Sequence, residues 1–258
     1  MNNADVYNNI EDFKKRMKKE FVNINVENGI EIIKALRSKD NILVLEFPNK
    51  IGISGITQIK KDRNKDYICI YVNTNDPIGR RNFSFLHEIY HVFYEKSNRG
   101  YSLKRYFKTD EIEKRAEIFA SNILIPRDKL LIELKRHGCK KGKAITMDKI
   151  FKLQIKFKAS FQAIACSIES LNKDSRYNER YQKYIPNIEA NIRRYYQKWD
   201  DLEEKTLFDN KNNNLNSIKP EYIFPEKFKE DIYKNFKCGR ISKNDILSIY
   251  DFFGEELK

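Results

Sequence analysis

The sequence has few histidines, few cysteines and no long apolar run. Its 258 residues include 3 histidines and 4 cysteines, and the cysteines lie far apart with no CxxC pair: Cys69, Cys139, Cys166 and Cys238. That spacing excludes the disulfide framework of a small secreted domain and indicates free thiols in a reducing compartment. Neither the first twenty residues nor any later segment offers the roughly 18 apolar residues that a membrane-spanning helix needs. We therefore expect a cytoplasmic protein without a membrane partner.

The chain is strongly basic, with a formal net charge of +13. Clustered lysines and arginines bind phosphates by releasing counterions, so a DNA-binding regulator is one hypothesis. The densest basic stretch, residues 129–158, has ten Lys or Arg against two acids, Glu133 and Asp148. Elsewhere the basic residues alternate with many of the 37 acidic ones, which is typical of a general charge bias. DNA binding is therefore the alternative and not the leading hypothesis.

Apolar spacing predicts an α+β fold for the first half of the chain. Two amphipathic helices open it, and residues 42–47, 51–56 and 67–74 then have the β-branched or alternating pattern of strands in a small twisted sheet. Helical spacing returns in residues 83–94 and 112–123, where the second stripe stops before a proline. A pair of helices close together in sequence should therefore follow the sheet.

The second half is predicted to be helical. Residues 129–172 contain two helices joined by a short turn, a helix-turn-helix-like arrangement, and residues 173–258 form a helical C-terminal region with an Asn-rich mobile loop near 209–217. We accordingly divide the chain into a core at 1–128, a helical module at 129–172 and the C-terminal region at 173–258. That last region is a candidate module for sensing a partner and controlling the core.

The segment His87-Glu88-Ile89-Tyr90-His91 carries the clearest chemical signal. Two histidines four positions apart on a helix project from one face, so both imidazoles can bind a single metal ion. Glu88 lies about 100° further round the helix, where its carboxylate can take a proton from a water beside the metal. A chance occurrence of HExxH is improbable in a chain with 3 histidines. The motif predicts a metal hydrolase with Glu88 as the general base.

A catalytic zinc usually has three protein ligands, so two histidines leave one position to fill. The next predicted helix contains Glu113 and Glu117 on one face, and spacing alone does not choose between these two, Glu95 and Glu111. Whichever glutamate binds the metal, a neighbour one turn away could support a histidine ligand. Zinc is the expected ion, with Mn²⁺ or Fe²⁺ as alternatives for a site with two nitrogens and one oxygen.

The two segments together resemble a known family. RNFSFLHEIYH at residues 81–91, followed by EKRAEIFASNILIP at residues 113–126, is similar to the ImmA/IrrE metallo-endopeptidases, and the resemblance extends faintly over residues 30–171. It implies a zincin-like metallopeptidase core with an active-site helix pair. It also implies that Glu113 is the third metal ligand and that Glu117 supports the site, although the family usually has Asn or Asp at that second position.

The same resemblance implies a function. Members of this family cleave helix-turn-helix transcriptional repressors, which relieves repression of a mobile element or a stress response. A peptidase of this kind holds its substrate as an added strand on a sheet edge, so residues 67–73 or residues 52–56 are the candidate edges. The donor that stabilises the oxyanion is open between Tyr94, Tyr101 and an arginine.

Overall fold

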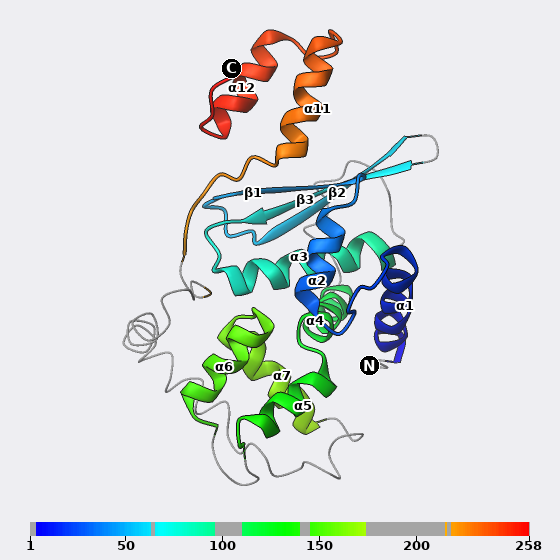
Figure 1. The fold of residues 1–258 in the computed structure, drawn as a ribbon, viewed down its shortest axis with the longest axis vertical. Helices are drawn as coiled ribbons and strands as arrows, with labels where there is room; N and C mark the ends of the chain where they lie inside the picture. The colour runs from blue at the N-terminus through cyan, green and yellow to red at the C-terminus, as the bar shows by residue number, and fades with distance from the viewer. Residues whose placement is uncertain are drawn as a thin grey trace.

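A computed structural model describes residues 4–62, 65–95, 110–139, 145–173, 215 and 218–257. It has the α+β architecture that the sequence predicts (Figure 1). The expected mobile loop at 209–217 lies, apart from Leu215, outside these residues. The elements in chain order are α1 (Ala4–Glu20), α2 (Gly29–Arg37), β1 (Ile42–Phe47), β2 (Gly55–Asp62), β3 (Lys65–Asn73), α3 (Ile78–Tyr94), α4 (Asp110–Leu124), α5 (Arg127–Arg136), α6 (Met147–Phe157), α7 (Phe161–Lys173), α11 (Glu226–Lys237) and α12 (Lys243–Phe252).

The sheet has three strands in the order β1-β3-β2, with β1 parallel and β2 antiparallel to β3. Strand β3 is therefore paired on both sides, and the expectation that residues 67–73 offer a free edge is wrong. The alternating pattern identifies a strand, but pairing order depends on tertiary structure. The other candidate edge, residues 52–56, runs into β2, which is an outer strand of the sheet. This strand begins at Gly55, later than the predicted start at Ile51.

One face of the sheet is covered by α2 and α3 (Figure 1). Most side chains on that face are apolar and buried, as Ile70 and Val72 show at 0% exposure, and Phe85 and Ile89 of α3 are equally buried. Helix α1 packs against α4, where the rings of Phe13 and Phe119 meet edge to face with their centroids 5.1 Å apart. The burial of this apolar surface holds α3 between the sheet and α4.

The helix-turn-helix-like module docks its turn onto the start of α3. Gly79 allows this contact, because a Cβ there would lie 2.5 Å from the Ser160 nitrogen and 2.6 Å from the Ala159 carbonyl carbon. One helical turn later, the Asn82 amide donates a hydrogen bond to the Lys158 carbonyl at 2.8 Å. The turn between α6 and α7 is thus part of the packing around α3.

Residues 218–224, called the strap below, tie the C-terminal region to the same end of α3. The buried guanidinium of Arg81 donates to the carbonyls of Asp76 (2.8 Å), Thr74 (3.0 Å) and Lys219 (2.8 Å), and to the carboxylate of Glu221 (3.1 Å). Two of its four acceptors therefore come from the strap. A buried arginine needs all of these partners, because an unpaired buried charge is strongly destabilising.

Beyond the strap, α11 and α12 form a hairpin on the opposite side of the sheet from α3 (Figure 1). The strap first pairs with β1, where the Ile223 amide donates to the Glu46 carbonyl at 2.9 Å. The hairpin then buries its own apolar cluster, which also contacts Leu45 of β1 and includes Phe224, Ile232, Ile246 and Phe253. In this part the helical C-terminal region expected from the sequence is confirmed. Among the described helices, none has the length and apolarity required to cross a membrane.

The strap contact predicts a measurable stability. Thr74 is fully buried, and its hydroxyl donates to the Glu221 carbonyl at 2.9 Å and accepts from the Glu221 amide at 3.2 Å. Thr74→Val should lower the free energy of unfolding by about 2 kcal/mol, because both backbone groups lose their partner. Urea unfolding measures the change. Thr146→Val is the control, since Thr146 is exposed and makes no capping bond; equal stability of the two variants would contradict a stabilising strap.

Candidate metal centre

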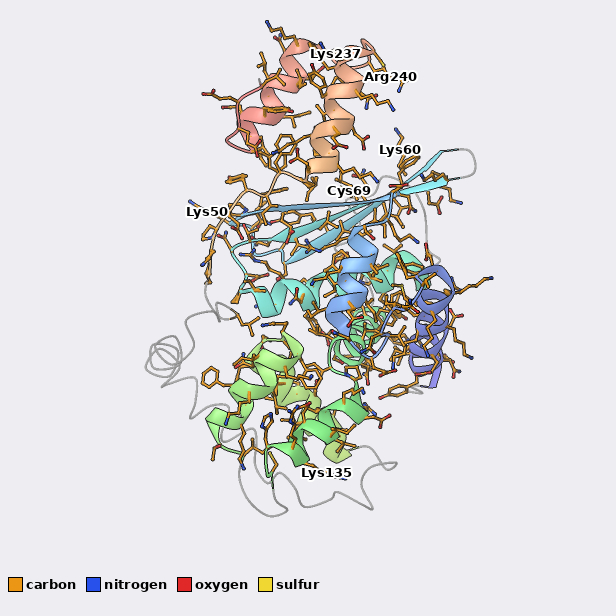
Figure 2. The ribbon with its side chains drawn as sticks, in the orientation of Figure 1. Lys50, Lys60, Cys69, Lys135, Lys237 and Arg240 are labelled. Carbon is orange, nitrogen blue, oxygen red and sulfur yellow. The ribbon has the colours of Figure 1, made fainter. Side chains whose placement is uncertain are left out.

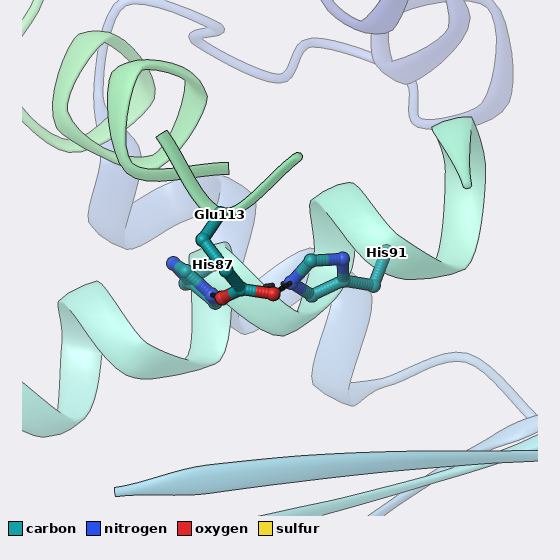
Figure 3. A group of neighbouring side chains, drawn as sticks. All are labelled: His87, His91 and Glu113. Atoms are coloured by element: carbon teal, nitrogen blue, oxygen red, sulfur yellow. Dashed lines mark hydrogen bonds and ion pairs between the residues drawn. The ribbon is translucent and has the colours of Figure 1, made fainter. Parts of the chain in front are cut away.

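Helix α3 presents the motif histidines on the side away from its apolar core face. The helix begins after Pro77, whose ring suits the start of a helix and would disrupt the hydrogen bonding within one. Phe85, Leu86 and Ile89 are fully buried and fix the rotation of the helix about its axis. With that rotation set, His87 and His91 lie one turn apart and point toward α4 (Figure 3).

The two histidines and Glu113 of α4 converge on one point (Figure 3). His87 Nε2 lies 3.1 Å from His91 Nε2, and the Glu113 carboxylate lies 3.0 Å from His87 Nε2 and 3.7 Å from His91 Nε2. Around a tetrahedral zinc with bonds of about 2.0–2.1 Å, ligand atoms are roughly 3.3–3.4 Å apart. The three groups therefore have the spacing of a single metal site.

The donor set and its burial also suit a catalytic metal. Two imidazole nitrogens and one carboxylate oxygen match zinc, and they do not exclude manganese or iron. His91 is fully buried, whereas the side chains of His87 and Glu113 are 17% and 36% exposed. The site is closed on the His91 side and open on the other, as a site that admits a substrate must be.

A fourth residue, Glu95, contacts the outer nitrogen of His91. Its Oε2 lies 2.9 Å from His91 Nδ1, and its side chain is 8% exposed. A carboxylate in this position keeps the proton on Nδ1 and leaves Nε2 free for the metal. Spacing leaves Glu95 as a candidate ligand, but the structure places it behind the histidine, at the C-cap of the same helix. Glu117 is exposed on α4, and the supporting role implied for it remains a prediction.

Glu88 is buried between α3 and the sheet. It is 7% exposed, and its Oε2 accepts a hydrogen bond from the Thr57 hydroxyl of β2 at 2.8 Å. The carboxylate thus faces an outer strand, on the helix turn that carries His87. A buried carboxylate beside a metal site can accept a proton where bulk water does not compete for it.

Tyr94, a candidate oxyanion donor, is hydrogen-bonded to α1. Its hydroxyl donates to the Asn9 carbonyl of α1 at 2.8 Å and lies 3.1 Å from an Asp12 oxygen. Burial raises the pKa of this phenol, so it stays protonated and bound to α1. Tyr101, the other tyrosine considered as an oxyanion donor, lies outside the described residues.

Comparison with known families identifies the same region. The model of the IrrE N-terminal-like domain, Peptidase_M78, matches residues 41–169, which is half of the chain. The chain belongs to this family. The matched span includes the sheet, α3 and α4, and membership in Peptidase_M78 makes the chain a metallopeptidase. The strap and the C-terminal hairpin lie beyond the match. No curated protein matches the sequence closely enough to count as a relative.

The contact between Glu95 and His91 predicts which glutamate supports the metal. Glu95→Gln should weaken zinc binding about 10-fold or more, because His91 loses its charged partner. Glu117→Gln tests the supporting role that the family resemblance implies for Glu117, and Glu111→Gln, an exposed glutamate of α4, is the matched control that should leave the affinity unchanged. Competition with a chromophoric zinc chelator measures the dissociation constants of all three variants. A loss confined to Glu117→Gln would assign the supporting role to Glu117 instead.

Proposed function

We propose that the chain is a zinc-dependent endopeptidase in which His87, His91 and Glu113 bind the metal and Glu88 is the general base. The observation that carries the proposal is the convergence of the three ligand atoms within 4.8 Å of one another, with the buried Glu88 carboxylate on the same helix turn. Membership in a metallopeptidase family supports the same reaction class.

The side chains divide the reaction between them. The zinc, when bound, would polarise the scissile carbonyl and lower the pKa of a coordinated water toward neutrality. The Glu88 carboxylate would accept a proton from the attacking water and return it to the leaving amine. Glu95 keeps His91 oriented throughout, and the buried side of the site keeps bulk water away from His91.

An extended peptide is the substrate shape that this arrangement favours. Strand β2 is an outer strand of the sheet, so its backbone can pair with an added strand, and its Thr57 contacts Glu88. A peptide paired there would pass beside the general base. We infer that this edge receives the substrate. The substrate we propose is a helix-turn-helix transcriptional repressor, whose cleavage in the cytoplasm relieves repression.

The alternative, a DNA-binding regulator with a structural metal, is less well supported. A helix-turn-helix protein inserts the start of its second helix into the major groove. Here Ala159 in the turn and Phe161 at the start of α7 are 0% and 3% exposed, and the turn docks on Gly79. Lys135, from the basic stretch, lies at the opposite end of the molecule from Lys237 and Arg240 (Figure 2). The burial of the turn and of the start of α7 favours the peptidase.

Glu88→Gln tests the proposed chemistry. This variant should bind zinc as the wild type does but should be about 10²–10⁴-fold slower at cleaving a helix-turn-helix repressor that the wild type cleaves, because the amide cannot take the proton. Cleavage is followed by mass spectrometry with and without a chelator. Glu111→Gln, an exposed glutamate of α4, is the control and should cleave normally. Undiminished cleavage by Glu88→Gln, or cleavage that survives the chelator, would contradict the mechanism.

A further inference from the structure

We propose that strand β2 positions the general base: the Thr57 hydroxyl orients the Glu88 carboxylate, and the absence of a side chain at Gly55 leaves room for it. The inference rests on the proposed function, since it concerns the residue assigned there as the base. Thr57 and Gly55 are positioning residues that act through Glu88.

Thr57 is a polar residue in an otherwise apolar row of the sheet. It pairs with Ile70 of β3, which pairs in turn with Val44 of β1. All three side chains are buried, with exposures of 3%, 0% and 8%. A valine would suit such a row, whereas a buried hydroxyl requires a hydrogen-bond acceptor. Glu88 Oε2 at 2.8 Å is that acceptor, so the hydroxyl is explained by the carboxylate beneath it.

Gly55 supplies an independent observation on the same carboxylate. A Cβ at this position would lie 3.0 Å from Glu88 Cγ and 3.3 Å from Glu88 Oε1. The backbone of Gly55 does not have the positive φ that favours glycine, unlike Gly52 at +79°. Space for Glu88, and not a turn, therefore accounts for the glycine. A side chain there would require Glu88 to move by a few tenths of an ångström.

Together the two residues leave one carboxylate oxygen available. Oε2 is held by the Thr57 hydroxyl, so the carboxylate cannot rotate freely and Oε1 is left to accept a proton. A base must lie within hydrogen-bond reach of the proton that it removes, and small misplacements reduce rates sharply. Loss of a residue that orients a metal-site group typically reduces affinity or activity 10–100-fold.

A binding measurement on the zinc-loaded full chain tests whether Thr57 and Gly55 position Glu88, and it needs no known substrate. Acetohydroxamate is the probe, because it chelates zinc while its hydroxyl proton requires an acceptor beside the metal. Thr57→Val should raise its dissociation constant about 10-fold, Gly55→Ala should do the same, and Thr57→Ser should restore the wild-type value. Gln58→Ala, an exposed position on the same strand, is the matched control and should bind normally. Zinc affinity should be unchanged in all four variants.

A double-mutant cycle separates positioning from a structural role. In the Glu88→Gln background, Thr57→Val should cause no further loss of acetohydroxamate affinity, because its effect passes through the Glu88 carboxylate. Wild-type affinity in Thr57→Val, or the same loss in both backgrounds, would overturn the proposal. If Thr57→Val does not fold, Gly55→Ala carries the same cycle. Failure of the wild type to bind zinc would instead overturn the proposed function.

Discussion

The packing of α4 along α3 decides whether this chain has a metal site, because the two histidines belong to one helix and the glutamate to the other. Ala116 and Ala120 are fully buried on α4, and small residues there let the helix axes approach. Phe119 lies between them in sequence and fills the space beside Phe13 and Tyr90, at ring distances of 5.1 Å and 5.5 Å. An apolar contact thus brings three polar ligands to one point.

The same helix is also connected to the C-terminal region. Arg81 lies nearly three turns before His91 and donates to Lys219 and Glu221 of the strap, while Gly79 admits the turn of the helix-turn-helix-like module. Segments far apart in the sequence therefore converge on the start of α3. Among the described residues, the C-terminal hairpin is joined to the rest of the fold by the strap, by the contact with Leu45 of β1 and by the ion pair between Lys227 and Asp40. These contacts give the idea of a sensing tail a defined physical route.

Local sequence patterns predicted the parts of the site that lie on one helix. The spacing of His87 and His91 follows from the helical repeat, and the α+β architecture followed from the change in apolar period. Glu113 needed more than spacing, because four glutamates were equally placed until the family resemblance favoured one. Glu95 was visible at i+4 from His91, but the sequence did not say whether it would bind the metal or the histidine.

Other features carry no local signal. The strap contacts Thr74 and Arg81 across about 140 residues of chain, and no periodicity reports such a pairing. Strand order likewise emerges only when β3 inserts between β1 and β2, which is why the prediction of an edge at residues 67–73 is wrong. Thr57 lies just beyond the strand predicted at residues 51–56, and its contact with Glu88 depends on how the sheet packs against α3.

X-ray absorption at the zinc edge, on the full chain loaded with one equivalent of zinc, tests the central claim most directly. The structure predicts a first shell of nitrogen and oxygen at about 2.0–2.2 Å with multiple scattering from two imidazoles and no sulfur. A shell containing sulfur at about 2.3 Å would place the metal on cysteine and contradict the site. Absence of bound zinc, or scattering from a single imidazole, would contradict it equally.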